Sequence, residues 1–356
     1  MGGTGDRKAD HIRICLEEDV SGGVDAGWAG YRFDHAALPG IAFDQVDPST
    51  ILLGRRLAWP FLVGALTGGT DRAGRFNLLL ARAAEASGCG MVLGSLRAAL
   101  EDPAAEASFD VRAAAPGLPL LLGNLGAAQL ARDGIEARLS GLCDRLRLDG
   151  VVVHLNPLQE ALQVEGDRDW RGLAARIEAL RAALAREGRL LGVKEVGSGF
   201  SPGMARWLGR LRPDWVETAG AGGTSFARVE GRRTRDAAMR RAGETFAAWG
   251  HPSVESLAAV RAGAPGVPVV ASGGLRSGLD LARAIRLGAS AGAMALPLLK
   301  AAAAGGTAAG SLLEALRLEL RVAMFATGSR SLDDLRRVPM RGPDGGRVPF
   351  ARMASR

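Results

Sequence analysis

The sequence predicts an α/β protein built as a TIM (β/α)8 barrel, and two observations support this. From Phe61 onward, short apolar runs alternate about eight times with amphipathic or alanine-rich stretches in one unbroken series. Such a series favours a closed parallel barrel over a doubly wound sheet. Moreover, 47% of the residues are hydrophobic but only 5% are aromatic, which indicates a core of Ala, Leu, Val and Gly. We expect an irregular N-terminal extension over 1–60, the barrel over 61–330 and a polar tail over 331–356.

The expected strands and helices follow this alternation. Apolar runs place the eight strands at 61–67, 90–94, 119–124, 150–154, 190–195, 214–219, 267–272 and 291–295. Helical patterns lie at 7–18, 103–114, 127–147, 170–186, 278–287 and 310–326. The arginine-rich stretch 225–250 after the sixth strand is too long for a plain connection, so we expect it to act as a lid. The polar tail should be mobile at its end.

Composition argues against several classes of function. The formal net charge is +7, but the arginines are spread through helical stretches without interleaved aromatic residues, which indicates a solvated surface rather than a nucleic-acid site. No run approaches the length of a membrane span, and the N-terminus lacks an apolar signal core. Cys15, Cys89 and Cys143 are not spaced as metal ligands and read as reduced thiols. A small anionic partner is the second interpretation of the charge after a solvated surface, and a nucleic acid is a distant third. We expect a cytoplasmic protein that does not bind a membrane.

The stretch 150–160 is the one around which the expected site is arranged. An apolar run ends here and is followed by His154, Asn156, Gln159 and Glu160, while Pro157 prevents the strand from continuing. In a parallel barrel the carboxyl ends of all strands meet at one face, where the chemistry takes place. We expect these four side chains to leave the strand in a loop at that face. The alternative is an ordinary polar loop.

The last two strand ends carry a pattern typical of phosphate binding. Gly273 and Gly274, followed by Arg276, lie where strand seven passes into a helix, and Ala295-Leu296 closes strand eight. Glycines allow backbone N–H groups to approach a phosphate, whose charge the helix N-terminus favours. Flavin enzymes and sugar-phosphate enzymes share this pattern, so it indicates a ligand group and not a reaction. Glycines that serve only as turn residues are the alternative.

Charged residues at the other strand ends leave several roles open. Lys194 could form a Schiff base, lie as a fixed cation beside an electron-rich ring, or pair with Glu195. Glu160 could hold Mg²⁺ together with a substrate phosphate, or be a surface carboxylate. Arg7, Lys8, His11 and Arg97 suit a diphosphate clamp, although each alone is more often an exposed charge.

These residues resemble the FMN-dependent type 2 isopentenyl-diphosphate Δ-isomerases. The resemblance runs from about Arg7 to Arg336, and its most specific motif is His154-Leu-Asn-Pro-Leu-Gln-Glu160. Further matches are Arg7-Lys-x-x-His-Ile-Arg13, Thr67-Gly-Gly-Thr70, Gly94-Ser-x-Arg-Ala-Ala-Leu-Glu-Asp102, Asn124-Leu-Gly126, Val193-Lys-Glu-Val-Gly197, Ala219-Gly-Ala-Gly-Gly-Thr-Ser225, Ala271-Ser-Gly-Gly274 and Met324-Phe-x-Thr-Gly328.

The resemblance implies roles for individual residues. Gln159 would face the reacting carbons with Glu230 behind it, Lys194 would tune the flavin, and Glu160 would bind Mg²⁺. The residues expected to meet the diphosphate substrate are Arg7, Lys8, His11, Ser95, Arg97, His154, Asn156 and Gln159, so the N-terminal extension would contribute to the substrate site. Those expected to meet FMN are Ala65, Leu66, Thr67, Ser95, Asn124, Lys194, Thr224, Gly273, Gly274, Arg276, Ala295 and Leu296.

The resemblance also implies the reaction. It is a 1,3 proton shift between isopentenyl and dimethylallyl diphosphate that uses reduced FMN and Mg²⁺, with NADPH as the expected flavin reductant and a homotetramer or homooctamer as the assembly. One alternative is another FMN barrel enzyme, such as a 2-hydroxy-acid dehydrogenase. That class needs a His after strand six, whereas 217–225 contains none. A non-enzymatic phosphate- or RNA-binding barrel is disfavoured by the absence of an aromatic and basic stripe.

Three residues depart from the family pattern. Leu66 stands where the family usually has Met, and Phe226 where it has Trp; both keep apolar bulk and should be tolerated. Leu96 replaces a Gln between Ser95 and Arg97. We expect this change to remove a polar group beside the phosphate or substrate, which leaves open an altered substrate or a slower turnover.

Overall fold

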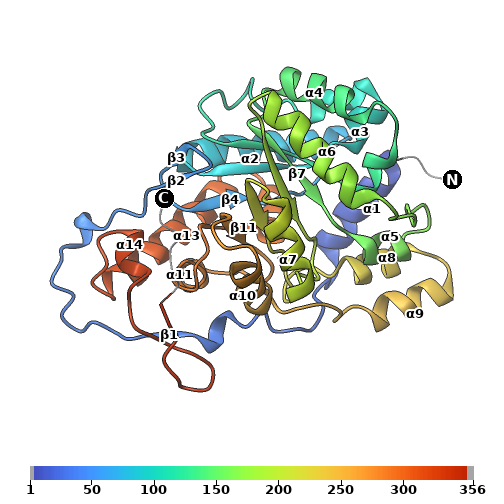
Figure 1. The fold of residues 1–356 in the computed structure, drawn as a ribbon. Helices are drawn as coiled ribbons and strands as arrows, with labels where there is room; N and C mark the ends of the chain where they lie inside the picture. Colours follow the sequence, from blue (N-terminus) through green and yellow to red (C-terminus); the bar gives the residue numbers. More distant parts are fainter. Residues whose placement is uncertain (1–3, 351–356) are drawn as a thin grey trace.

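The barrel expected from the sequence is present. The computed structural model describes residues 4–350, and within them eight parallel strands close into one barrel (Figure 1). Strand 150–154 was predicted to the residue, and the others differ by a few residues at their ends. In chain order the strands are β4 (Phe61–Val63), β5 (Gly90–Ser95), β6 (Leu121–Gly126), β7 (Gly150–His154), β8 (Leu190–Lys194), β9 (Trp215–Glu217), β10 (Val269–Ala271) and β11 (Ala291–Met294).

Helices surround this barrel, and none of those described in residues 4–350 is long and apolar enough to cross a membrane. They are α2 (Asp71–Ser87), α3 (Arg97–Glu101), α4 (Ile135–Leu146), α5 (Pro157–Leu162), α6 (Leu173–Arg186), α7 (Pro202–Leu211), α8 (Phe226–Arg233), α9 (Ala237–Thr245), α10 (Ser253–Gly263), α11 (Gly278–Arg286), α12 (Leu296–Ala304) and α13 (Ala308–Phe325).

Two predicted helices were wrong in part. The stretch 103–114 contains only the short 3-10 helix η3 (Pro103–Ser108), because Pro103 follows an extended Asp102 that caps a new turn. The helix expected over 127–147 is split into η4 (Ala127–Ala131) and α4. The break occurs at Gly134, which has a left-handed backbone (φ 68°). An Ala-rich composition alone therefore did not locate the helix boundaries.

The interior of the barrel is a separate apolar cluster. Its largest side chain is the indole of Trp215, which is fully buried. The indole packs against Gly192 of the neighbouring strand so closely that a Cβ there would lie only 2.2 Å from it. A glycine in β8 is thus required by the tryptophan in β9. Around the indole lie the inward-facing aliphatic residues Leu62, Val92, Leu122, Val152, Val270, Ala291 and Ala293.

The N-terminal segment covers both ends of the barrel, although we expected it to be irregular. The hairpin of β2 (Thr50–Leu52) and β3 (Arg55–Leu57) adds Leu52 and Leu57 to the interior cluster. Helix α1 (Thr4–Glu17) instead contacts α8 and α12. Figure 1 shows the hairpin and α1 on opposite sides of the barrel.

The stretch 225–250 forms α8 and α9, two ordered helices whose first turns are capped by Ser225 and Asp236. Helix α8 packs against α1 and α5. Its movement as a lid stays a prediction.

The C-terminal tail is more structured than we expected. Within it, α14 (Leu332–Leu335) buries two leucines, and β12 (Met340–Arg341) pairs antiparallel with β1 (Arg32–Phe33). The fully buried Arg286 of α11 donates hydrogen bonds to the carbonyl groups of Val338, Val348 and Pro349. The apolar residues among the polar ones anchor the tail as far as this point. The mobile end that we predicted falls on 351–356, outside the described residues.

Candidate active site

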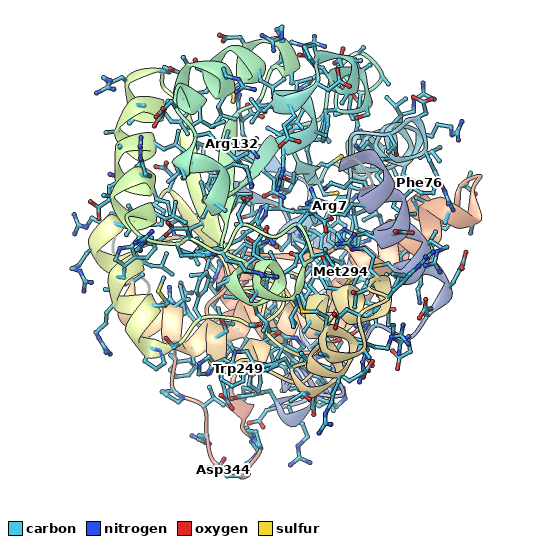
Figure 2. All side chains as sticks on the ribbon, turned by 90° about the vertical axis from the view of Figure 1, so that its right-hand side faces the viewer. Arg7, Phe76, Arg132, Trp249, Met294 and Asp344 are labelled. Atoms are coloured by element: carbon cyan, nitrogen blue, oxygen red, sulfur yellow. The ribbon has the colours of Figure 1, made fainter. Side chains whose placement is uncertain are left out.

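A cavity of about 210 Å³ opens where the carboxyl ends of the strands meet. Every residue predicted for the site lines it except Glu230. Helix α1, the loops after the strands and the first turns of α5 and α12 form its walls. In Figure 2, Arg7 and Met294, which both line it, lie near the middle of the ring of helices. The polar strand ends therefore do converge, as expected for a barrel.

The stretch after β7 forms a short helix and not the loop that we predicted. Pro157 occupies its first turn, where a missing N–H is harmless, and helix α5 begins there. One turn of helix brings Gln159 and Glu160 beside Asn156, whose amide donates to Gln159 Oε1 at 3.1 Å and to Glu160 Oε1 at 3.0 Å. The three polar groups are thus held as one unit.

Glu230 of α8 lies behind this unit. Its Oε1 accepts hydrogen bonds from Gln159 Nε2 and His11 Nε2, both at 2.9 Å, and its Oε2 accepts from Arg233 Nε at 2.9 Å. Burial would raise the pKa of Glu230, but the hydrogen bond and charge of His11, with Gln159 and Arg233, lower it to about 2. The carboxylate is therefore ionised at neutral pH. Glu230 does not itself line the cavity but holds the amide of Gln159 from behind, and its catalytic role stays a prediction.

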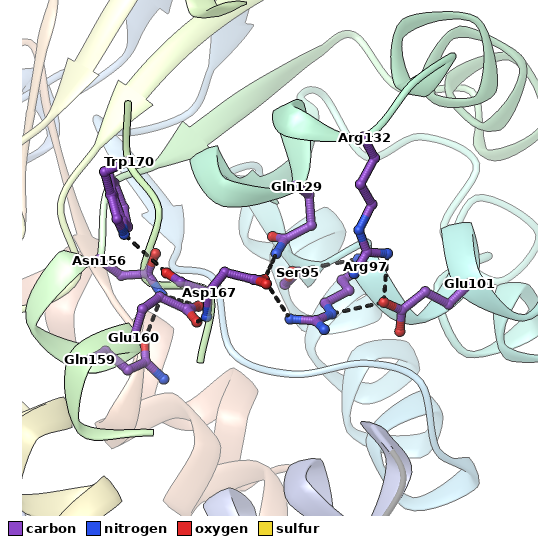
Figure 3. A network of polar contacts seen from close by, with 10 residues as sticks. All are labelled: Ser95, Arg97, Glu101, Gln129, Arg132, Asn156, Gln159, Glu160, Asp167 and Trp170. Atoms are coloured by element: carbon purple, nitrogen blue, oxygen red, sulfur yellow. Dashed lines mark hydrogen bonds and ion pairs between the residues drawn. The ribbon is translucent and has the colours of Figure 1, made fainter. Parts of the chain in front are cut away.

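One wall of the cavity is strongly basic. Arg7 and Lys8 are only 8% and 9% exposed. Burial, with the charges of Arg7 and Arg97, lowers the pKa of Lys8 to about 8. Arg97 is held by Glu101 at 2.9 Å and by Asp167 at 3.3 Å, as Figure 3 shows. Desolvated cations of like charge repel one another, so this wall is adapted to an anion.

Helix α5 and the loop after it are tied to this basic wall. Asp167 Oδ2 accepts from Arg97 and from Gln129 at 3.1 Å, while its backbone N–H donates to Glu160 Oε2 at 2.7 Å (Figure 3). Burial raises the pKa of Glu160. No cluster of three or more metal-binding side chains occurs among residues 4–350. A Mg²⁺ ion at Glu160 would therefore need oxygen atoms from a phosphate to complete its shell.

His154 is neutral in this setting. Burial and the nearby charges of Lys194, Lys8 and Arg7 lower its pKa to about 3. Its Nδ1 lies 2.8 Å from Asn124 Oδ1, which fixes the orientation of the ring. The imidazole can therefore offer a hydrogen bond to a ligand without adding a charge to the basic wall.

A close-packed glycine turn forms another part of the cavity wall. Gly273 and Gly274 have left-handed backbones, with φ of 93° and 68°. A Cβ on Gly273 would lie 2.2 Å from the carbonyl oxygen of Gly220, and a Cβ on Gly274 would lie 2.5 Å from the Ala26 side chain. These glycines are needed for the turn itself, and because they line the cavity without side chains, a ligand can approach their backbone closely. Elsewhere in the cavity wall, the buried Thr67 Oγ1 has no partner within the described residues. The cavity therefore fits a ligand that carries a phosphate and a polar ring, as FMN does. The features that fit it are the glycine turn, the unpaired hydroxyl of Thr67 and the cation of Lys194.

Lys194 is not paired with Glu195. Its Nζ donates to the backbone carbonyl of Glu195 at 2.7 Å and lies 3.6 Å from Glu217 Oε1. The Glu195 carboxylate instead accepts N–H groups of the following loop, including those of Val196 and Gly197 at 2.7 Å. Glu217 lines the cavity but was not among the predicted site residues. Its place at the carboxyl end of a strand was the signal that would have found it.

Comparison with known proteins is informative over nearly the whole chain. An isopentenyl-diphosphate delta-isomerase of Nostoc sp. is 44% identical over 335 residues, covering 94% of each chain. A protein of the same name from Xanthobacter autotrophicus is 45% identical over 341 residues, covering 95% of this chain and 98% of that protein. The chain belongs to the isopentenyl-diphosphate delta-isomerase family.

The flavin-dependent, type 2 branch of this family is the one that fits. The family model described as FMN-dependent dehydrogenase matches residues 249–341, which include the glycine turn and strand β11. A putative lactate oxidase of Pediococcus acidilactici superposes with a TM-score of 0.69 at 16% identity, covering 94% of this chain and 90% of that chain. A mandelate oxidase variant with (S)-mandelic acid gives 0.62 at 19% identity, covering 94% of both chains. At these identities the likeness shows the barrel fold alone.

The departures from the family pattern lie in different surroundings. Leu66 and Phe226 line the cavity, as expected for residues that keep apolar bulk. Leu96, in contrast, is fully buried and packs against the backbone of Gly123, away from the cavity. The expectation that Leu96 removes a polar group beside the ligand was therefore wrong, because the side chain turns into the apolar core while its N–H donates to the Asn124 carbonyl at 2.7 Å.

Proposed function

We propose that this protein interconverts isopentenyl diphosphate and dimethylallyl diphosphate by a 1,3 proton shift, with reduced FMN and Mg²⁺. The observation that carries the proposal is the position of Gln159 and Glu160. They lie on one helical turn and line the same cavity as a basic wall suited to a diphosphate and a glycine turn suited to a flavin phosphate. Family membership supports the reaction, and the flavin family match supports the cofactor.

The basic wall would bind the diphosphate. Arg7, Lys8 and Arg97 offer charge-assisted hydrogen bonds, and the neutral His154 adds a further polar contact. Glu160 would hold Mg²⁺ jointly with the phosphate oxygens. Since Arg97 is already engaged by two carboxylates, we expect the diphosphate to compete with Asp167 for it. Substrate binding is thereby linked to the loop after α5.

The glycine turn and Lys194 would hold FMN. The other residues that we expect around FMN also line the cavity; they are Thr67, Ser95, Asn124, Thr224, Arg276, Ala295 and Leu296. When bound in its reduced form, FMN supplies an electron-rich ring with proton-donating and proton-accepting atoms, which ordinary side chains lack for an unactivated alkene. Lys194 is a buried fixed cation that favours an electron-rich ring next to it.

Gln159 orients the reacting part of the substrate and does not remove a proton itself, since an amide is not a base at neutral pH. Its N–H is held by the ionised Glu230 and its carbonyl oxygen by Asn156. The side chain therefore keeps one orientation without needing a ligand. Leu66 and Phe226 add an apolar surface that excludes water from a carbocation-like transition state.

Several finer expectations belong to this proposal. NADPH would be the flavin reductant, the protein would work in the cytoplasm, and the chain would assemble as a homotetramer or homooctamer. The reduced state of all three cysteines suits a reducing compartment, since all are free and buried. Sedimentation of the purified protein would decide the state of assembly.

The experiment is direct. The purified protein is reconstituted with FMN, reduced under nitrogen with NADPH or dithionite, and given isopentenyl diphosphate with Mg²⁺ while the alkene protons are followed by NMR. We expect dimethylallyl diphosphate only when the flavin is reduced. A protein that binds FMN but leaves the substrate unchanged would contradict the reaction and favour another FMN barrel enzyme. A protein that cannot bind FMN would contradict the cofactor as well.

A further inference from the structure

Glu217 is a buried carboxylate of the cavity for which the reaction above leaves no role. It ends strand β9 and is the register partner of Lys194 on β8. The residue is 4% exposed. Its Oε1 accepts from Ser272 Oγ at 3.0 Å and lies 3.6 Å from Lys194 Nζ, while Oε2 has no hydrogen-bond partner within residues 4–350. One oxygen of the carboxylate is therefore anchored and the other is unsatisfied.

An unsatisfied buried carboxylate oxygen is costly, so it points to a donor that a ligand brings. Lys194 is in the complementary situation. One of its three N–H bonds is used by the Glu195 carbonyl, and the distance to Glu217 is too long for a good hydrogen bond. Side by side at one level of the barrel, the two residues offer a free acceptor and free donors.

A flavin carries the matching groups. Its pyrimidine ring has carbonyl oxygens that accept and an N–H that donates, and its ribityl chain has hydroxyl groups that donate. We propose that Glu217 is a positioning residue of the flavin site, whose Oε2 accepts a hydrogen bond from a donor of bound FMN while Lys194 donates to a neighbouring FMN acceptor. The inference rests on the proposed function only as far as FMN is the cofactor.

The pair also sets the charge beside the ring. Reduced flavin gains negative charge, which Lys194 stabilises and the Glu217 carboxylate opposes. Glu217 would therefore secure FMN while moderating how strongly the site favours the reduced form. Two separable properties of the bound cofactor, its affinity and its midpoint potential, should depend on this one side chain.

Two substitutions separate the hydrogen bond from the charge. Glu217→Leu removes both, and we expect the FMN dissociation constant, measured by fluorescence quenching without substrate, to rise tenfold or more. Glu217→Gln keeps an acceptor but removes the charge, so affinity for oxidised FMN should remain close to that of the unaltered protein. The midpoint potential of the FMN bound to this variant should rise. The rise is about 30 mV if the affinity for two-electron reduced FMN, relative to that for oxidised FMN, increases tenfold. Glu255→Gln, an exposed charge removal on α10, is the control and should change neither.

Flavin analogues identify the donor. If the donor is the ring N–H, 3-methyl-FMN should bind poorly to the unaltered protein and should lose no further affinity in the Glu217→Leu variant. If the donor is a ribityl hydroxyl, 2′-deoxy-FMN should show both of these results instead. Unchanged FMN affinity and potential in both Glu217 variants would overturn the inference, because Oε2 would then be satisfied by water. That result differs from failure of the proposed function, in which the unaltered protein itself would not bind FMN or would not isomerise the substrate.

Discussion

The N-terminal segment covers the floor and the mouth of the barrel with opposite chemistry. At the floor, the β2–β3 hairpin inserts Leu52 and Leu57, which are 2% and 0% exposed, into the apolar interior. At the mouth, α1 places Arg7 and Lys8, which are almost as deeply buried, beside further cations. Equal burial thus has opposite energetic signs, since apolar side chains gain from leaving water whereas like charges lose.

This difference shows which end serves stability and which serves function. Burial of the hairpin leucines stabilises the folded chain without any ligand. At the charged end of α1, nearby carboxylates such as Glu230 offset only part of the cost, because burial and mutual repulsion still lower the pKa of Lys8 to about 8. An anion bound there would offset the rest. We therefore expect substitutions at the mouth to change ligand binding and turnover, and substitutions at the floor to change the free energy of unfolding.

The largest effect should come from Gln159→Ala. The substitution removes the oriented amide at the mouth but none of the residues proposed to hold FMN, so the protein should still bind the flavin. Turnover of isopentenyl diphosphate should fall about 100-fold or more, in the range typical of groups that act in proton transfer. An unchanged rate, measured by NMR with reduced FMN, would show that Gln159 is misplaced in this account. Glu230→Gln, which acts through Gln159, His11 and Arg233, should lower the rate less.

Arg7→Ala should come next. Loss of a buried cation that contacts the diphosphate should raise KM by about 30-fold or more, as expected for 2 kcal/mol or more from a buried charge contact. Neither FMN affinity nor the fold should change much, because the remaining cations of the wall repel one another less. Arg13→Ala on the exposed side of the same helix is the matched control and should leave KM unchanged. Equal effects of both substitutions would mean that α1 acts only structurally.

At the floor, Leu57→Ala should lower the free energy of unfolding by about 2–5 kcal/mol, the usual cost of a cavity left by a buried leucine. Its KM and kcat at a temperature where it remains folded should match those of the unaltered protein. Urea unfolding measures the first quantity and the NMR assay the second. A substantial change in KM would break the proposed division between the two ends.

The pH dependence of binding should reveal Lys8. Its pKa is lowered to about 8, and only the protonated amine attracts the diphosphate. Affinity should therefore be constant below pH 8 and weaken by up to about tenfold per unit above it. Calorimetric titration of isopentenyl diphosphate between pH 6.5 and 9.5 measures this dependence. Lys8→Arg should keep its charge and shift the decline to higher pH; a pH profile identical in both proteins would assign it to another group.

The smallest effect should come from Leu96→Gln, which restores the residue common in the family. Because this side chain is buried in the core, the amide would lose its hydration without gaining a ligand contact. We expect a destabilisation of about 1–3 kcal/mol and an unchanged KM. A clear change in KM or in substrate preference would show that the side chain reaches the cavity after all.

The barrel and most of the site could be predicted because their signals are local. Apolar runs such as 150–154 are strands wherever they lie, and the barrel brings the residues that follow them to one face. His154, Lys194 and the glycine turn at 273–274 were found in this way. Glu217 was not among the predicted residues, although its place at the end of a strand is the same kind of signal.

The remaining features depend on contacts between segments distant in the sequence. Nothing near Leu52 and Leu57 shows that they enter the barrel floor, and nothing near Leu96 shows which way its side chain turns. Similarly, the separation of Lys194 from Glu195 arises because backbone N–H groups of the next loop occupy the Glu195 carboxylate. Adjacency in sequence therefore does not identify the partner of Lys194, which lies near Glu217 of the neighbouring strand.

Urea unfolding with and without ligand tests the division of the two ends most directly. The experiment compares three proteins, each loaded with oxidised FMN: the unaltered protein, Arg7→Ala and Leu57→Ala. Each is unfolded once with Mg²⁺ alone and once with Mg²⁺ and isopentenyl diphosphate. The diphosphate concentration is about 100 times the dissociation constant of the unaltered protein. The ligand should stabilise the unaltered protein and Leu57→Ala alike, by about 2.7 kcal/mol, although Leu57→Ala starts from a lower stability. Arg7→Ala should start from nearly full stability and gain much less. Equal stabilisation of Arg7→Ala would contradict the assignment of the mouth to the diphosphate.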